Sequence, residues 1–318
     1  MQNQLQMSIF FSIIIPLYNK EKYVLHTLKS VLNQTFGDYE VIVVEDCSTD
    51  TSFEVISTFE SEKVKIIKHD FNKGLSATRN TGIKNASSNY IAFLDADDVW
   101  KQTYLAELYL LIKSFPDAKL FATNYEELYQ NNTVLLPNNN ATNLKEKTII
   151  PDFFEISLAQ PLYCPSSFCV EKSVFDTIGF YNENIQFGED VDFNIRANLS
   201  FQLCYSKNAL VKYTMLSENQ ITQSVVSGKV ITDFDFFERT TTSKSLKKYL
   251  DFHRYIMAKH FKAENNATEF NKMKKGIDIK NLNFKQRILL NAPIFILNLV
   301  KKVKLFFLSK GIRLSTYQ

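Results

Sequence analysis

The chain has 318 residues, 45% of them hydrophobic and 22% charged, with a formal net charge of +3. This length and apolar content suffice for a buried core in one large or two modest domains, which excludes a globally disordered chain. The four cysteines form no CxxC pair and do not lie at zinc-ligand spacing beside the four histidines. We therefore expect a reduced, cytoplasmic protein whose cysteines are small core residues.

Apolar runs alternate with helical stretches over the first 125 residues. The first run is too short for a signal or membrane helix, so it is interpreted as a strand. Near-continuous apolar strands joined by helices indicate right-handed βαβ units and a parallel sheet covered on both faces, with ligands at the carboxyl ends of the strands. Strands are expected at residues 9–15, 40–46, 64–70, 90–98 and 119–125, and helices at 20–34, 49–60 and 74–86.

The composition changes beyond this region. Residues 129–147 are polar and rich in asparagine, which predicts a loop or an exposed hairpin at a boundary. A helix is expected from residue 188, where Glu189 and Asp190 suit a helix N-terminus, and residues 230–275 are predicted to be helical. The chain is accordingly divided into residues 1–125, 126–225 and 226–318.

The C-terminal tail, residues 284–313, combines large apolar residues with lysines, and no acidic residue follows Asp278. Its charge-free run, residues 288–300, contains Pro293 and is too short to span a membrane. An apolar face with a basic rim predicts a helix that lies in the plane of an anionic membrane surface. The alternative is a helix packed on the rest of the protein with a solvated basic face.

Neither common glycine-rich phosphate loop is present. The chain has only eight glycines and contains no GxxxxGK[ST] and no GxGxxG after its first strand. A P-loop kinase or GTPase is therefore excluded, and a dinucleotide dehydrogenase is disfavoured.

Three carboxylates, Asp95, Asp97 and Asp98, follow an apolar run in "YIAFLDADDVW" at residues 90–100. Clustered like charges are unfavourable unless water, a cation or a basic partner neutralises them, so the stretch is either an exposed acidic turn or a site. Alternate residues of an extended segment face the same side, which predicts that Asp95 and Asp97 converge. Their hard oxygen atoms suit Mg²⁺ or Mn²⁺ held together with substrate phosphates.

Five segments in order resemble family 2 glycosyltransferases, which are inverting enzymes of the GT-A fold. The first four resemble the nucleotide-sugar-binding half of these enzymes, and the fifth resembles their later ED motif. The resemblance implies an α/β fold with a Rossmann-like, mostly parallel sheet flanked by helices. Residues 1–125 would bind the nucleotide-sugar, 126–225 the acceptor, and 226–318 would form a helical C-terminal extension. The segments are "SIIIPLYNKEKYVLHTLKSVLNQTF" (12–36), "EVIVVEDCSTD" (40–50), "NKGLSATRNTGIKNA" (72–86), "YIAFLDADDVW" (90–100) and "GEDVDFNIRANL" (188–199).

The resemblance also implies which residues contact the nucleotide. Tyr18 would stack on a pyrimidine base, Asp46 would accept the N3–H of uracil, and Arg79 would lie near the base and the phosphates. The other nucleotide-sugar contacts that it implies are Pro16, Glu21, Asp95 and Ala96.

The resemblance also implies the ligands of a metal ion and the catalytic base. Asp97 is the expected metal ligand, and Asp95 is expected nearer the ribose and as a second ligand. Asp190 is the expected base that deprotonates the acceptor hydroxyl, with Glu189 as the second candidate. A single base without an enzymic nucleophile gives single displacement and inversion.

Each assignment has an ordinary structural alternative. Loop packing would explain Tyr18, and a helix cap or Asx turn would explain Asp46. A surface salt bridge would explain Arg79, and stabilisation of a helix start would explain the two acids at 189 and 190.

The resemblance implies transfer of one sugar from a UDP-sugar to a hydroxyl of a glycan or lipid-linked acceptor, assisted by Mg²⁺ or Mn²⁺. The protein would act on the inner face of a bacterial membrane and would have no nucleic-acid partner. The chain also departs from the family pattern. Cys47 stands where glycine is usual, residues 213–222 lack a histidine that many members carry, and the QxxRW motif of processive synthases is absent.

Two other functions stay open. Residues 95–99 fit the pattern DxDx[TV] of haloacid-dehalogenase-like phosphatases, in which Asp95 would be a nucleophile, although that motif normally ends the first strand. The second is a nucleotide-sugar-binding fold that has lost catalysis.

Overall fold

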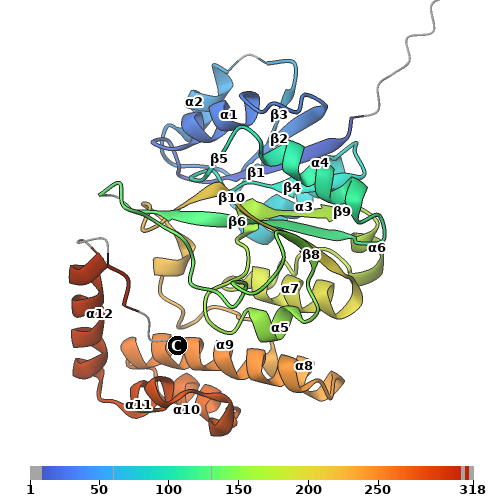
Figure 1. Ribbon diagram of the computed structural model, residues 1–318. Coiled ribbons are helices and arrows are strands. Elements are labelled where there is room, and N and C mark those ends of the chain that lie inside the picture. The colour runs from blue at the N-terminus through green and yellow to red at the C-terminus, as the bar shows by residue number, and fades with distance from the viewer. Residues whose placement is uncertain (1–8, 60, 130, 309–311, 315–318) are drawn as a thin grey trace, which may run out of the picture.

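The computed structural model describes residues 9–59, 61–129, 131–308 and 312–314. One mixed sheet runs through the molecule, with α1, α2 and α4 above it and α5, α7, α8 and α9 below it in the view of Figure 1. The strands are β1 (Phe11–Leu17), β2 (Tyr39–Glu45), β3 (Val64–Lys68), β4 (Tyr90–Phe93), β5 (Val99–Trp100), β6 (Leu120–Leu128), β7 (Val134–Leu135), β8 (Lys147–Ile149), β9 (Phe168–Glu171) and β10 (Leu203–Thr214). The helices are α1 (Val24–Leu32), α2 (Ser52–Ser57), α3 (Leu75–Asn85), α4 (Tyr104–Ser114), α5 (Phe153–Ile156), α6 (Val174–Ile178), α7 (Glu189–Ser200), α8 (Phe234–Thr240), α9 (Lys244–Ala263), α10 (Ala267–Lys275), α11 (Phe284–Asn291) and α12 (Ile294–Leu308).

The sheet has the order β3-β2-β1-β4-β9-β6-β10-β5, with β7 paired to β6 and β8 paired to β10. The first four strands are parallel to one another, as predicted for βαβ units. β9 lies antiparallel between β4 and β6, and β10 is parallel to β6. The predicted α/β fold with a mostly parallel sheet is therefore confirmed. Because β6 continues past residue 125 and β9 and β10 belong to the same sheet, the first two predicted regions share one sheet.

The extent of the fourth predicted strand is wrong. β4 ends at Phe93, and the chain then turns, with the Asp98 amide donating to the Asp95 carbonyl at 3.0 Å. The Thr27 hydroxyl stabilises the turn, because its one proton lies within hydrogen-bond reach of the carbonyl oxygens of both Ala96 and Asp98. Asp95 and Asp97 therefore lie on a turn and do not share one face of an extended strand.

All seven residues of β1 are buried, because helices cover both faces of the sheet. Alternate residues belong to two different clusters of the core, with Ile13 and Ile15 in the same cluster as Leu28 of α1. On the other face α3 approaches Ile14 so closely that a Cβ at Gly82 would lie 2.4 Å from the Ile14 side chain. Only glycine permits this approach, which brings α3 and its polar residues against the strand.

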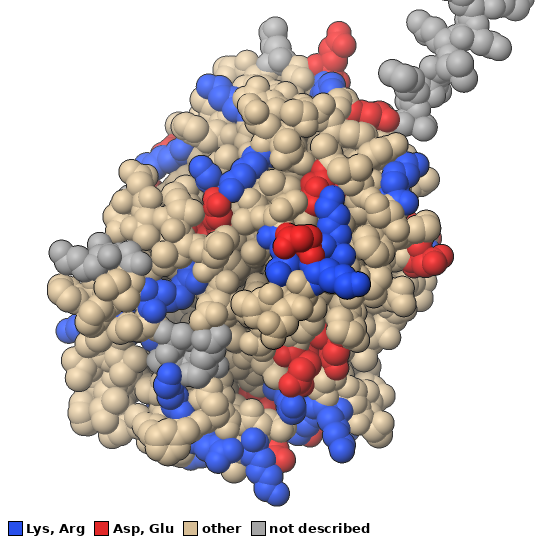
Figure 2. All heavy atoms as spheres, viewed as in Figure 1, with Lys and Arg blue, Asp and Glu red and all other residues tan. Residues whose placement is uncertain are grey.

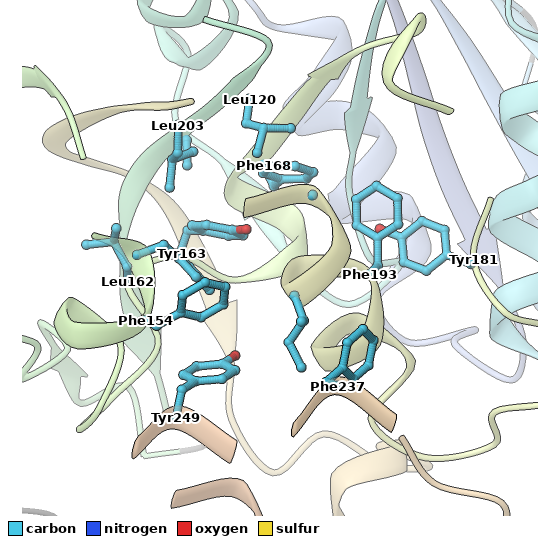
Figure 3. Close-up of a cluster of buried hydrophobic side chains, with 14 of the residues drawn as sticks. Leu120, Phe154, Leu162, Tyr163, Phe168, Tyr181, Phe193, Leu203, Phe237 and Tyr249 are labelled. Carbon is cyan, nitrogen blue, oxygen red and sulfur yellow. The ribbon is translucent and has the colours of Figure 1, made fainter. Parts of the chain in front are cut away.

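The core below the sheet joins α7 to the C-terminal helices. Figure 3 shows aromatic side chains from β9, α5, α7 and α9 packed in this layer. Phe193 of α7 stacks on Tyr181 with ring centroids 4.4 Å apart, and Tyr249 of α9 contacts Phe153 and Phe154 of α5. The helical region predicted at 230–275 is thus confirmed as α8, α9 and α10, and it packs on the same core as α7.

The predicted C-terminal tail forms two helices that are separated at Ala292 and Pro293. α12 contacts α9 through one side, where Leu297 and Val300 pack against the core. Beyond α12, Arg313 pairs with Glu127, while residues 309–311 of the predicted tail lie outside the described residues. Among the residues that the structure describes, no helix has the length and apolar character needed to cross a membrane.

Candidate active site

The predicted site residues follow the carboxyl ends of parallel strands. Tyr18 follows β1, Asp46 follows β2, and the turn at residues 95–98 follows β4. Since these three strands are neighbours in the sheet, their ends meet at one edge. The helices α3 and α7 bring Arg79 and Glu189 to the same place, where Arg79 pairs with both Asp95 and Glu189.

The turn between β1 and α1 is joined to the turn after β2. Asn19, which has a positive φ of 51°, accepts from the Thr49 amide at 2.7 Å through its side chain. Glu21 accepts from the Thr51 hydroxyl and amide, and these hydrogen bonds hold the pKa of Glu21 below its usual value. The carboxylate of Glu21 therefore already has partners in the turn after β2. Tyr18 is 41% exposed and available as a stacking platform.

Pro16 and Ala96, two of the predicted nucleotide-sugar contacts, are buried. Pro16 lies within β1 opposite Val44 of β2. Ala96 is 2% exposed in the turn after β4. Because both side chains are buried, any contact of these residues with a ligand would come through the backbone.

Asp46 is buried, and its carboxylate binds the loop that precedes α3. The Lys73 and Gly74 amides each donate to it at 2.8 Å, and His69 Nδ1 lies 2.7 Å from the same carboxylate. Asp46 thus fixes the N-terminus of α3 and does not cap its own turn. Within "DCSTD" the local turn is made by Asp50, whose side chain accepts from the Ser52 amide two residues further on. His69 directly follows β3, and nothing in the sequence indicated its contact with Asp46.

Arg79 is buried between two carboxylates. Its Nη2 lies 2.9 Å from Asp95 Oδ1 and its Nη1 lies 2.8 Å from Glu189 Oε1, with the guanidinium over the Tyr181 ring. The two acids raise the pKa of Arg79 above its already high value, against the opposing effect of burial. With 1% of its side chain exposed, Arg79 does not form the surface salt bridge considered as the alternative. Arg79, from the segment 72–86, thus joins the segments 90–100 and 188–199 to its own in one network.

The three aspartates after β4 have different partners. Asp97 Oδ2 lies 2.7 Å from Lys20 Nζ and accepts from the Ser217 hydroxyl at 2.5 Å. Asp98 is fully buried and accepts from the Thr214 amide and the Ser166 hydroxyl. Burial, reinforced by Asp97 and Asp95, raises the pKa of Asp98 well above its usual value. Asp98 is therefore a structural residue that ties the turn to β10, whereas Asp95 and Asp97 line the site.

Asp95 and Asp97 suit a divalent cation that takes its other ligands from phosphate and water. No group of three or more His, Cys, Asp or Glu side chains is arranged to hold a metal within the described part of the chain. The two carboxylates alone would thus hold an ion only together with a ligand such as a diphosphate. Sequence reasoning missed Lys20 and Ser217, which contact Asp97 from segments far from it in the chain.

Asp190 lies at the N-terminus of α7, where its carboxylate accepts from the Val191 amide at 2.9 Å. Burial and the neighbouring Glu189 charge raise the pKa of Asp190 to about 6, while Arg79 opposes the shift. A carboxylate with a raised pKa is a better proton acceptor when it is ionised near neutral pH. Because Glu189 is paired with Arg79, Asp190 is the stronger of the two candidates for a base.

A family model described as "Glycosyl transferase family 2" matches residues 12–172. The glycosyltransferase GlyA of Streptococcus pneumoniae is 40% identical over 115 residues, which cover 36% of this chain and 16% of that protein. The Escherichia coli protein WfgD is named as a UDP-Glc:alpha-D-GlcNAc-diphosphoundecaprenol beta-1,3-glucosyltransferase. It is 36% identical over 125 residues, which cover 39% of this chain and 48% of that protein. The matched region thus spans less than half the length of both relatives.

The fold is also similar to a solved structure, the S. aureus TarS fragment 1–349 in complex with UDP-GlcNAc. The similarity has a TM-score of 0.58 and 18% sequence identity, and it covers 88% of this chain and 78% of the TarS fragment. At this identity the match concerns the fold, and it supports the GT-A assignment.

Proposed function

The chain belongs to glycosyl transferase family 2. We propose that it transfers one sugar from a UDP-sugar to an acceptor hydroxyl by a single inverting displacement. The observation that carries the proposal is the network around Arg79, which joins Asp95 of the donor motif to Glu189. Asp190 follows Glu189 directly, so a base lies next to the carboxylates that face the donor. The proposed donor site and base are thereby joined by the two ion pairs of Arg79.

The proposed roles follow from the contacts. Tyr18 stacks on the uracil ring, and Asp46 orders the loop at the N-terminus of α3 beside the base. Asp190 accepts the proton of the acceptor hydroxyl as that oxygen attacks the anomeric carbon, and UDP departs from the opposite side. No side chain is required as a nucleophile, which is why inversion is expected.

Mg²⁺ or Mn²⁺ is proposed as the cofactor, held by Asp97 and Asp95 together with the diphosphate. When bound, such an ion neutralises charge that develops on the leaving diphosphate. Asp95 also remains paired with Arg79, so its orientation does not depend on the ion.

The phosphatase alternative is wrong. In that class the nucleophilic aspartate ends the first strand, whereas Asp95 follows β4, after three strands of the same sheet have been formed. Asp95 Oδ1 is also paired with Arg79, and the family model covers this whole region.

Donor binding is the first test, because it needs no acceptor. We expect one UDP-sugar to raise the melting temperature in the presence of Mn²⁺, with GDP-, dTDP- and CMP-sugars giving smaller shifts. The Asp97→Ala variant should lose the part of the shift that depends on the metal. If no nucleotide sugar shifts the melting temperature with or without metal, the proposed donor class is wrong.

A glycan or lipid-linked acceptor is proposed at a bacterial membrane surface, which is consistent with the name of the WfgD relative. The structural support is α12, whose side chains Phe295, Leu299 and Phe306 are each more than half exposed. Their spacing places them along one face of the helix, away from the side that packs on the core. Lys301 and Lys302 are exposed on the same helix.

The surface charge agrees with attachment to anionic lipid. Figure 2 shows lysine and arginine side chains over the C-terminal helices at the lower end of this face, next to broad uncharged areas. An amphipathic helix of this kind inserts its apolar face at the headgroup boundary, and each basic residue near the surface adds about 1 kcal/mol. We therefore propose that α12 holds the protein on the cytoplasmic leaflet.

Full-length protein is expected to sediment with vesicles that contain anionic lipid at low salt, and to be released at high salt. The Phe295→Glu/Leu299→Glu double variant should remain in the supernatant, because it places two charges on the inserted face. Leu110→Glu on α4 is the matched control, since Leu110 is an exposed leucine of a helix far from α12 in the sequence. Equal sedimentation of the double variant and the wild type, or no sedimentation of either, would contradict attachment through α12.

A further inference from the structure

Lys20 is a cation placed on the carboxylate that is proposed to bind the metal. Its ammonium group lies 2.7 Å from Asp97 Oδ2, 3.1 Å from the Ser217 hydroxyl and 2.8 Å from the Glu218 carbonyl oxygen. An ammonium group has three protons, so these three acceptors satisfy it. Only 11% of the Lys20 side chain and 9% of the Asp97 side chain are exposed, so solvent screens this pair little.

The neighbouring Lys22 provides a contrast. It pairs with the Glu218 carboxylate at 2.8 Å, but both of these side chains are about 60% exposed. Exposed pairs of this kind contribute little because water and salt screen them. Of the two lysines in the turn before α1, only Lys20 reaches into the site.

Both candidate metal ligands therefore have a cationic partner before any ligand arrives. Asp95 is paired with Arg79, whose planar guanidinium is buried and held by a second carboxylate. Asp97 is paired with Lys20, whose ammonium is a point charge at the end of a flexible four-carbon chain. A divalent cation at Asp97 Oδ2 and the ammonium would repel each other, so one must leave when the other binds.

We propose that Lys20 keeps divalent metal away from Asp97 until a nucleoside diphosphate enters, and that it then turns to the diphosphate. This inference rests on the metal-assisted transfer proposed above. The diphosphate brings enough negative charge to balance both cations, and its oxygen atoms replace the acceptors that Lys20 gives up. Metal and nucleotide should consequently bind with positive coupling, each raising the affinity for the other.

The same movement releases the segment that covers Asp97. Ser217 and the Glu218 carbonyl are held by Lys20, and Ser217 also donates to Asp97.

The experiment measures Mn²⁺ affinity from the electron paramagnetic resonance signal of free Mn²⁺, using the full chain with and without UDP. Wild type should bind Mn²⁺ weakly alone and more tightly with UDP. Lys20→Met should bind Mn²⁺ alone about tenfold more tightly than wild type, since the competing cation is gone, and should lose most of the gain caused by UDP. Lys20→Arg should behave like wild type, and so should Lys22→Met, the matched control.

A further variant separates the charge of Lys20 from the release of the covering segment. Ser217→Ala removes the hydroxyl but leaves the ammonium on Asp97, so its Mn²⁺ affinity without UDP should stay close to that of wild type. If Lys20→Met does not bind Mn²⁺ more tightly, or if Ser217→Ala shows the same gain, the role given to Lys20 is wrong. If wild type binds UDP but never Mn²⁺, the metal assistance itself fails and this inference falls with it, while the donor class survives. Circular dichroism of each variant verifies that it is folded.

Discussion

Replacing Asp190 by asparagine is expected to lower the rate of sugar transfer by about 10²–10⁴-fold while UDP binding stays unchanged. The amide cannot accept the proton of the acceptor hydroxyl, but its oxygen can still accept from the Val191 amide as the carboxylate does. The proposed donor contacts are made by other residues, so the loss should fall on the chemical step. Transfer rates and UDP affinity measured on the same preparations check this.

The pH dependence provides a second signature of the same residue. The pKa of Asp190 is raised to about 6, so the proposed base is ionised above that pH. If Asp190 is the base, kcat/KM should fall as the pH drops through about 6. Because the pKa of Asp190 is higher in the folded than in the unfolded protein, its ionised carboxylate destabilises the folded state above about pH 6. This destabilisation is absent below the pKa that Asp190 has in the unfolded chain. The neutral asparagine should therefore not lower the stability at pH 7–8, so unfolding cannot explain a loss of activity.

Asp192→Asn is the matched control for Asp190→Asn. It removes an acid from the same helix, where Asp192 pairs with Arg196 and takes no part in the Arg79 network. This variant should keep most of the activity and the acidic limb of the pH profile. Full activity of Asp190→Asn would contradict the role of Asp190, and a wild-type protein that binds UDP-sugar without any transfer would support the inactive-fold alternative.

The sequence predicted the parts of the fold that local pattern determines. The alternation of apolar runs and helical stretches led to β1, β2, β3 and the helices between them, and the acids at 189 and 190 led to the start of α7. Pairing over long sequence separations could not be predicted in this way. The antiparallel insertion of β9 between β4 and β6 joins segments that are about 50 to 80 residues apart. No periodic pattern in the sequence indicates which strands will pair in this way.

The turn after β4 shows the same limit. The apolar run up to residue 94 gives no sign that the strand stops at Phe93. The turn is fixed by Asp98, whose buried carboxylate binds Ser166 and Thr214 from distant segments. The pairing of Lys20 with Asp97, 77 residues apart, is likewise a product of tertiary structure. The residue types at the site were thus predictable, but the partner of each one was not.

Arg79→Met is expected to lower the free energy of unfolding by about 3 kcal/mol and to abolish transfer. The change removes a buried cation and leaves Glu189, with 9% of its side chain exposed, and Asp95 without their shared partner. An unpaired buried carboxylate is much less stable than one paired with a guanidinium. Denaturant unfolding and transfer assays at pH 8 measure the two effects.

The pH dependence identifies the cause of this destabilisation. Burial favours the neutral form of a carboxylic acid that has no cationic partner, so the Arg79→Met variant should regain stability as the pH falls. The difference in unfolding free energy from wild type should accordingly be smaller at pH 5 than at pH 8. If the difference is the same at both pH values, lost packing and not an unpaired charge explains the effect.

Two further variants test whether the Arg79 network does more than stabilise the fold. Arg79→Met/Glu189→Gln removes the more buried of the two stranded charges, so it should regain stability relative to Arg79→Met and yet stay inactive, because Asp95 and α7 are no longer joined. Arg239→Met, at an exposed arginine of α8, should change the unfolding free energy by no more than about 0.5 kcal/mol. Recovery of activity in the double variant would mean that the network stabilises the fold but does not hold donor site and base together, which would remove the main structural support for the proposed mechanism.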